Sequence, residues 1–287
     1  MDSSVFFPDE SNIEIIIPSS NEGSKFDEYA RKNFPIRFQR EVLLRRISSI
    51  ILNMLPVPGK SDVIDIGCWI GDNSLVWSKM IEQKKGRVLA IDPSQKNIDW
   101  IDMIADKNKI NNLITQCSIC SYKNDINFTH FRDDLPSWNT DRRWKETKND
   151  SPKVTSSRTL DELASECLGS TNSIFLMHLD VEKMEVDVLK GAHEIVNQSK
   201  PFIFFEAHLL TDRNNLLHLK SYFKSKRYRV YMLNEVTLGT NLDCRNFLAI
   251  PEEESSIIDV LQDMNLLLKI DTTVVIPATD GSPLIPC

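Results

Sequence analysis

Short apolar runs alternate with segments of helical period over most of this chain. Five such runs stand at Val63–Ile66, Val88–Ile91, Leu113–Ile119, Ile174–Leu179 and Pro201–Phe205. The segments between them repeat their apolar residues at helical spacing, as Met184, Val188 and Ile195 do. Buried parallel strands joined by helices produce this pattern. The sequence therefore predicts an α/β fold with a Rossmann-like, mostly parallel sheet and helices on both faces.

Two further strands are expected after the parallel set, near Val230–Leu233 and Phe247–Ile250. The connection between them is short, so we expect them to run antiparallel to each other. A helix around Leu216–Phe223 precedes them. The predicted sheet therefore has seven strands.

Three regions follow from this pattern. Residues 1–59 form an N-terminal extension on the substrate side, polar and irregular except for a short strand at Ile13–Ile17 and a helix at Phe38–Leu55. Residues 60–251 form the main domain, and residues 252–287 form a tail with one helix at Ile257–Leu268. Residues 132–158 are polar and aperiodic, which indicates an inserted lid loop. Its two tryptophans either stack on a sugar ring or anchor the loop; they are Trp138 and Trp144.

Charge and hydropathy exclude several classes of protein. The chain has 34 basic and 41 acidic residues, a formal net charge of −7. This balance disfavours a nucleic-acid binder held by phosphate contacts. No apolar run approaches the ~20 residues of a membrane span, and the N-terminus lacks the basic region of a secretory signal. We expect a soluble, cytoplasmic protein.

Acidic side chains lie at the ends of four of the predicted parallel strands. They are Asp65, Asp92, the pair Asp180 and Glu182, and Glu206, which His208 follows. Ligands of open α/β sheets bind at the carboxyl ends of the strands. A strand end is also an ordinary solvated place for a single acid. Solvation therefore explains any one of these acids, but it explains acids at all four strand ends less well.

The segment Asp65-Ile-Gly67-Cys-Trp-Ile-Gly71 is the most specific local signal. Its G-x-x-x-G spacing differs from the dinucleotide fingerprint, and Gly59-Lys60-Ser61 lacks the first glycine of a P-loop. An acid before the first glycine and a second acid, Asp92, after the next strand favour S-adenosylmethionine. A carboxylate at Asp92 can accept hydrogen bonds from ribose hydroxyls. We expect Asp65, Gly67, Gly71 and Asp92 to bind this cofactor; nucleotide binding or a vestigial fold are the alternatives.

Several ordered motifs together resemble the FkbM family of S-adenosylmethionine-dependent methyltransferases. They are Val63–Leu75, Thr159-Leu-Asp-Glu-Leu163, Asp180-Val-Glu-Lys-Met-Glu-Val-Asp-Val-Leu-Lys-Gly-Ala192, Pro201-Phe-Ile-Phe-Phe-Glu-Ala-His208 and Asn246-Phe-Leu-Ala-Ile-Pro251. The resemblance covers residues 60–251 and implies a class I methyltransferase fold. The family usually has Ala-Asn where this chain has Cys68-Trp69, and Gly where it has Lys183. These departures leave room for altered substrate choice or weakened activity.

The resemblance implies O-methylation of a hydroxyl on a sugar, a glycan or another small polyol. Such a hydroxyl needs a base or a metal ion at neutral pH. In one arrangement Asp180 and Glu206 bind Mg²⁺ and Glu182 is the base; in the other Glu182 or His208 takes the proton directly. His178 is expected in the core or behind the site. The alternative function is a catalytically silent, methyltransferase-like binding or assembly module.

Overall fold

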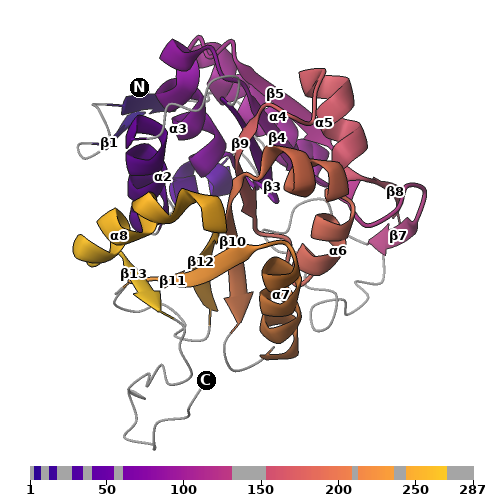
Figure 1. Cartoon of the computed structure of the whole chain (residues 1–287). Helices are drawn as coiled ribbons and strands as arrows, with labels where there is room; N and C mark the ends of the chain where they lie inside the picture. Colours follow the sequence, from indigo (N-terminus) through magenta and orange to yellow (C-terminus); the bar gives the residue numbers. More distant parts are fainter. Residues whose placement is uncertain are drawn as a thin grey trace, which may run out of the picture.

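The computed structural model describes residues 3–7, 13–17, 28–34, 41–54, 61–130, 153–208, 213–235 and 244–269 (Figure 1). A single large sheet runs through this part of the chain, and helices cover both of its faces. No helix in these ranges is long and apolar enough to cross a lipid bilayer.

The large sheet has eight strands in the order β13-β11-β12-β10-β9-β3-β4-β5. Its parallel part comprises β3 (Asp62–Ile66), β4 (Val88–Asp92), β5 (Leu113–Cys117), β9 (Ile174–Leu179) and β10 (Phe202–His208). The chain begins this part in the middle, at β3, builds outward to β5, and then crosses to β9. The order of the strands therefore switches between β3 and β9, where the carboxyl ends of two strands diverge.

The far edge of the sheet is antiparallel. It comprises β11 (Tyr228–Leu233), β12 (Cys244–Pro251) and β13 (Leu267–Lys269). β12 lies between β10 and β11 and runs antiparallel to both, which confirms that the last two predicted strands are antiparallel to each other. The predicted helix at Ile257–Leu268 is shorter than expected: α8 (Ser255–Asp263) ends early, and β13 pairs with β11 as an eighth strand. The count of seven strands was therefore one too low.

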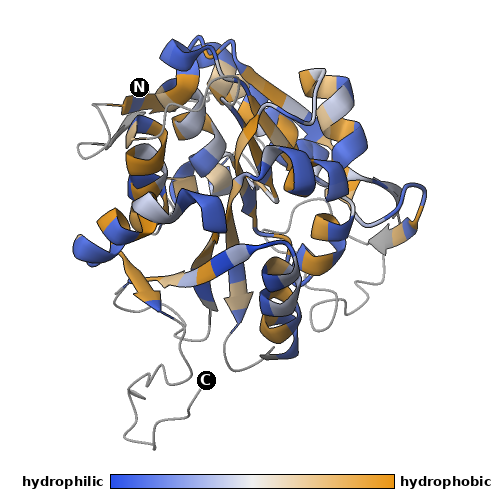
Figure 2. Cartoon of the chain, in the orientation of Figure 1, coloured by the Kyte–Doolittle hydropathy of each residue, from blue (hydrophilic) through white to orange (hydrophobic). Residues whose placement is uncertain are grey.

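Helices of opposite faces bury separate apolar clusters (Figures 1 and 2). One face carries α5 (Leu160–Leu168), α6 (Glu185–Lys190) and α7 (Arg213–Ser225). The other carries α2 (Val42–Met54), α3 (Asp72–Ile81), α4 (Gln95–Lys107) and α8. Successive strand residues point to opposite faces, so Ile64 and Ile66 pack under the first group while Val63 packs under the second.

Local signals set the ends of several helices. The side chain of Thr159 accepts a hydrogen bond from the backbone N–H of Glu162 at 3.4 Å, as the capping box predicts, and Gly169 ends α5 with φ +66°. Ser94 caps α4 in the same way through the N–H of Asn97. These ends depend on neighbours within one helical turn, which is why the sequence predicts them well.

The N-terminal region is more ordered than expected. β1 (Ser3–Phe7), which the sequence analysis treated as irregular, pairs antiparallel with the expected strand β2 (Ile13–Ile17). Ile13, Ile15 and Ile17 are buried in the cluster that α3 and α4 form, and a short helix over residues 28–34 adds to it. The region therefore belongs to the packed molecule.

Only the last part of the predicted lid loop, residues 132–158, can be compared with the structure. Residues 131–152, with both tryptophans, Trp138 and Trp144, lie outside the described ranges. At its end, Lys153–Arg158 forms the strand β8 rather than a loop. β8 lies between β6 (Ile119–Cys120) and β7 (Asn127–His130) in a small separate sheet. The expected strand Leu113–Ile119 is accordingly split at Ser118 between two sheets.

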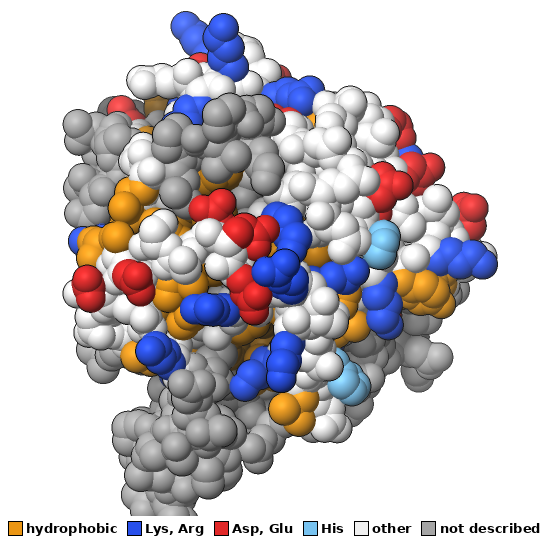
Figure 3. Space-filling model, viewed as in Figure 1, with side chains coloured by type: hydrophobic (Ala, Val, Ile, Leu, Met, Phe, Trp, Pro, Cys, Tyr) orange, Lys and Arg blue, Asp and Glu red, His pale blue; other side chains and the backbone are white. Residues whose placement is uncertain are grey.

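Charges of both signs are interleaved on the face shown in Figure 3. Two ion pairs lie near the antiparallel edge of the sheet: Arg227 lies 3.4 Å from Glu252, and Lys200 lies 3.9 Å from Glu253. Such exposed pairs contribute little to stability, about 0–1 kcal/mol each.

Candidate active site

The turn from β3 into α3 forms the centre of the candidate site. Gly67 has φ +80°, and a Cβ placed on it would lie 1.8 Å from the carbonyl oxygen of Asp180. The same strand end is held by the N–H of Asp180, which donates to the carbonyl of Ile66 at 3.0 Å. Glycine is therefore required at Gly67 because the end of β9 passes directly against the turn.

Asp65 joins three elements beneath this turn. Its carboxylate accepts a hydrogen bond from the hydroxyl of Ser74 in α3 and lies 2.8 Å from Nδ1 of His178 in β9. Burial lowers the pKa of His178, but the hydrogen bond and charge of Asp65 outweigh it and, with Glu41 and Asp180, raise the pKa to about 9. His178 is therefore protonated at neutral pH, in the buried position expected for it.

Asp92 lies next to the turn, at the end of β4. Its carboxylate accepts hydrogen bonds from the N–H of Trp69 at 3.0 Å, from the N–H of Ser94 at 2.8 Å and from the amide of Asn97 at 2.8 Å. The side chain is almost fully buried. Desolvation raises its pKa to about 7, although these donors act in the opposite direction. Asp92 and the turn are thus directly connected.

Trp69 occupies the middle of the turn with φ +45°, a conformation that bulky side chains rarely adopt. Its indole is buried and makes an edge-to-face contact with Tyr29, whose ring centroid lies 6.4 Å away. Tyr29 belongs to the short helix over residues 28–34. The indole therefore ties the turn to the N-terminal region.

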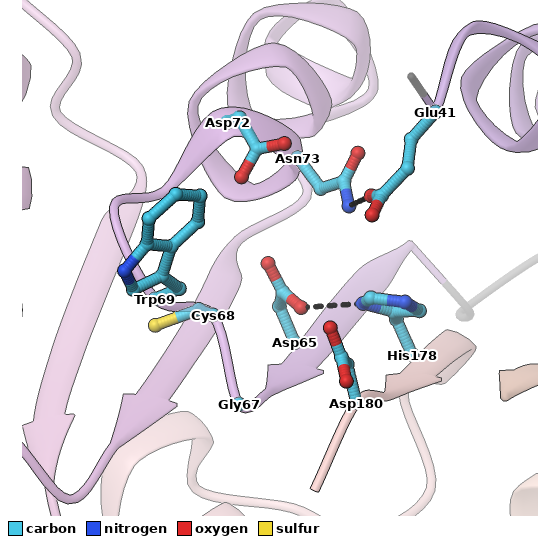
Figure 4. A pocket seen from close by; sticks show the side chains of 9 residues that line it. All are labelled: Glu41, Asp65, Gly67, Cys68, Trp69, Asp72, Asn73, His178 and Asp180. Carbon is cyan, nitrogen blue, oxygen red and sulfur yellow. Dashed lines mark hydrogen bonds and ion pairs between the residues drawn. The ribbon is translucent and has the colours of Figure 1, made fainter. Parts of the chain in front are cut away.

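A narrow hollow, which we call the turn pocket, opens above this turn (Figure 4). Its lining consists of the turn residues 67–69, the strand-end side chains Asp65, His178 and Asp180, the first residues of α3, Asp72 and Asn73, and Glu41 before α2. Figure 4 shows Asp65 and Asp180 extending from the strand ends toward Asn73 and Glu41. Four carboxylates and one imidazolium therefore surround the turn pocket.

The turn after β9 is also in an unusual conformation. Glu182 has φ +50° and Lys183 has φ +80°. The turn is held by Glu185, a buried side chain that accepts hydrogen bonds from the N–H of Lys183 at 3.0 Å and from the amide of Asn215 at 2.8 Å. Desolvation raises the pKa of Glu185 to about 6. Glu185 thus fixes the segment that carries Glu182.

Glu206 and His208 lie at the end of β10, half-buried, opposite Asn246 and Cys244 of β12. The amide of Asn246 donates to Glu235 at 3.1 Å, and desolvation with the nearby charge of Glu41 raises the pKa of Glu235. Within the described ranges, no three His, Cys, Asp or Glu side chains come together in a group that could hold a metal ion.

The structure thus brings some of the expected site residues together. Asp65, Gly67 and Asp180 line the turn pocket, whereas Gly71, Asp92, Glu182, Glu206 and His208 lie outside its lining. Glu41, Asp72, Asn73 and the buried Glu185 were not expected at the site. Asp72 and Asn73 directly follow Gly71, which is a usable signal, but nothing in the sequence links Glu41 to a turn that begins 26 positions later.

Residues 65–230 match the model of the methyltransferase FkbM domain. No curated protein is similar enough to count as a match.

Three solved structures illustrate the extent of the structural similarity. Methyltransferase FkbM from Methylobacillus flagellatus KT is 16% identical with a TM-score of 0.47, over 77% of this chain and 59% of that one. A SAM-dependent methyltransferase from Aquifex aeolicus is 13% identical with a TM-score of 0.40, over 79% and 98%. An rRNA methylase from Streptococcus thermophilus is 10% identical with a TM-score of 0.42, over 72% and 95%.

Proposed function

The chain belongs to the FkbM methyltransferase domain family, and on this premise we propose that it is an S-adenosylmethionine-dependent O-methyltransferase. The proposed acceptor is a hydroxyl group of a sugar, a glycan or another small polyol. The observation that carries the proposal is the turn pocket, which lies at the switch in strand order and has four carboxylates among its nine lining residues.

The chemistry of the turn pocket fits the methionine end of this cofactor. Both the sulfonium and the α-ammonium of the cofactor are cations, and the lining supplies Glu41, Asp65, Asp72 and Asp180 against the imidazolium of His178. The α-carboxylate has a partner as well. Gly71 precedes α3 and has no side chain that could cap this helix. The backbone N–H groups in the first turn of α3, at the pocket, are therefore the proposed partners of the α-carboxylate.

The adenosyl end is proposed to extend over Gly67 and Gly71 toward Asp92. One oxygen of this carboxylate, Oδ1, accepts from Ser94 and Asn97, and the other, Oδ2, accepts from Trp69. A carboxylate has about four acceptor sites, which leaves about one for a ribose hydroxyl. Asp65, Gly67, Gly71 and Asp92 are therefore the proposed cofactor-binding residues.

When bound, the cofactor supplies a methyl group activated by the positive sulfur. The chain must align the acceptor and remove the proton of its hydroxyl. We assign the proton to Glu182, which follows β9 on a turn that Glu185 fixes, with Asp180 beside the cofactor and His208 as the alternative base. Asp180 and Glu206 receive no role as Mg²⁺ ligands in this proposal, because the described residues show no grouping of three such side chains.

A catalytically silent, methyltransferase-like binding module is the second candidate. It is favoured by Trp69, since the indole is packed beside a narrow pocket and the backbone N–H of Trp69 already donates to the Asp92 carboxylate. A module of this kind would retain the fold without turnover.

Calorimetric titration with S-adenosylmethionine tests the proposal. We expect micromolar binding that is lost in Asp92→Ala and weakened in Asp92→Asn, with Asp99→Ala, an exposed carboxylate change on α4, as the unaffected control. Circular dichroism verifies folding, because Asp92→Ala leaves three buried donors without an acceptor. A folded wild-type protein that binds no cofactor would contradict the enzyme and favour the silent module.

The assignment of the base has its own test. Once an acceptor supports turnover, Glu182→Gln should lower kcat by about 10²–10⁴-fold and leave cofactor affinity nearly unchanged. Glu194→Gln, which changes an exposed carboxylate, serves as the control. Unchanged turnover in Glu182→Gln would assign the proton to another group, His208 being the next variant to make.

A further inference from the structure

We propose that Glu41, which lies outside the family-matched residues 65–230, is a binding residue for the cofactor and holds its α-ammonium. This inference rests on the proposed function. Glu41 precedes α2 and begins that helix, since its carbonyl accepts the N–H of Arg45 at 3.1 Å. Its side chain lines the turn pocket across from the strand-end acids (Figure 4).

A chain of hydrogen bonds holds the Glu41 carboxylate in place. The amide of Asn73 donates to Oε2 of Glu41, and Nη1 of Arg45 donates to Oδ1 of Asn73 at 2.8 Å. Arg45 is fully buried, a position that is costly for a guanidinium unless hydrogen bonds satisfy it. Asn73 and Arg45 are therefore positioning residues that act on Glu41 from two different helices.

The charges around the turn pocket favour a cation at Glu41. Four carboxylates line the turn pocket; His178 lies 2.8 Å from Asp65, and Arg45 lies 3.9 Å from Asp72. Glu41 and Asp180 add two further negative charges. The influence of Glu41 also reaches His178, whose pKa it helps to raise.

An ammonium group suits this site better than a neutral hydroxyl. It has three donors and a full positive charge, and a carboxylate oxygen accepts more than one hydrogen bond. Asn73 can therefore orient Glu41 while its carboxylate still accepts from a ligand. Within the cofactor, the α-ammonium belongs to the methionine half, for which the turn pocket is proposed.

Titrations with three ligands that share the adenosyl group test this inference. They are S-adenosylmethionine, S-adenosylhomocysteine and 5′-methylthioadenosine, of which the last has neither the α-ammonium nor the α-carboxylate. We expect Glu41→Gln to weaken the first two by at least tenfold and to leave the affinity for 5′-methylthioadenosine unchanged. Glu28→Gln, an exposed change on the neighbouring helix, should alter none of the three.

A double-mutant cycle separates positioning from binding. Asn73→Ala should weaken S-adenosylmethionine but not 5′-methylthioadenosine, and it should cause no further loss when combined with Glu41→Gln. Equal weakening of all three ligands by Glu41→Gln, or no weakening at all, would overturn the role of Glu41 and leave the proposed function intact. A wild-type protein that binds none of the three ligands would overturn both.

Discussion

Three residues of the candidate site hold backbone conformations that cost free energy for residues other than glycine. Trp69 has φ +45°, Glu182 has φ +50° and Lys183 has φ +80°. Each conformation costs on the order of 1 kcal/mol, and it persists because the surroundings impose it. At Trp69 the hydrogen bond to Asp92 does so, and at Lys183 the hydrogen bond to Glu185 does so.

Replacing Lys183 by glycine should therefore stabilise the protein. Lys183→Gly should raise the free energy of unfolding by about 0.5–1 kcal/mol, because glycine adopts positive φ without steric cost. Lys190→Gly is the matched control: Lys190 is exposed on α6, where glycine should lower the stability by up to about 1 kcal/mol. Urea denaturation measures both. A loss of stability in Lys183→Gly would show that this turn is not strained.

The strands β3 and β9 are joined at their ends by the pair of Asp65 and His178. Both side chains are nearly inaccessible to solvent, and Trp77 of α3 covers the imidazole edge-to-face at a centroid distance of 5.6 Å. The pair therefore links two strands and a helix at the point where the turn pocket opens. Because its pKa is raised in the folded state, the stability that His178 contributes depends on pH.

The sign of this dependence follows from the two pKa values of His178. The pKa of His178 is about 9 in the folded state and has an ordinary value of 6.5, so the stabilisation is complete below about pH 6.5 and is lost as pH rises through 9. Asp92 and Glu185, with raised pKa values of about 7 and 6, also lose stabilisation as pH rises, over an interval that ends about one pH unit above these values. A variant that lacks only His178 keeps these contributions, so the difference between the two proteins reports on His178.

Comparison of the wild type with His178→Gln tests this prediction. The difference in unfolding free energy between them should shrink, by an amount on the order of a few kcal/mol, between pH 6.5 and pH 9. Urea denaturation at intervals of half a pH unit measures it. Parallel curves for the two proteins across this range would mean that His178 is neutral in the folded state.

At the scale of the whole molecule, the proposed division into residues 1–59, 60–251 and 252–287 crosses a shared core. Leu44 and Ile47 of α2, Ile257 of α8, and Val63 and Leu248 of the sheet belong to one buried cluster. Each such aliphatic side chain stabilises the fold by about 1.5–3 kcal/mol when it is buried. The flanking helices therefore contribute to the stability of the sheet itself.

Ile47→Ala should accordingly destabilise the entire protein. We expect a loss of about 2–5 kcal/mol with a single cooperative transition, because the cavity opens in the core that α2 and the sheet share. Arg46→Ala, an exposed change on the same helix, should be nearly neutral. Thermal unfolding followed by circular dichroism gives the comparison. A main transition that does not move would show that residues 1–59 unfold as an independent unit.

The parts of the fold that the sequence predicts are those with short-range causes. The five parallel strands, the capping box at Thr159 and the end of α5 at Gly169 follow from the polarity and conformational preferences of neighbouring residues. The three residues of β13 are too few to show a pattern, and they form a strand because β11 offers an edge. β1 likewise forms a strand because β2 pairs with it.

The sequence by itself determined the α/β alternation, the strand ends that carry Asp65, Asp92 and Asp180, and the family motifs. Only the tertiary structure decided which groups these acids meet. His178 reaches Asp65 across 113 positions, and Glu41 comes to the turn pocket from a helix outside the family-matched segment. Periodicity reflects which face of an element is buried, whereas hydrogen bonds between distant residues depend on how whole elements pack, and packing is a property of the complete molecule.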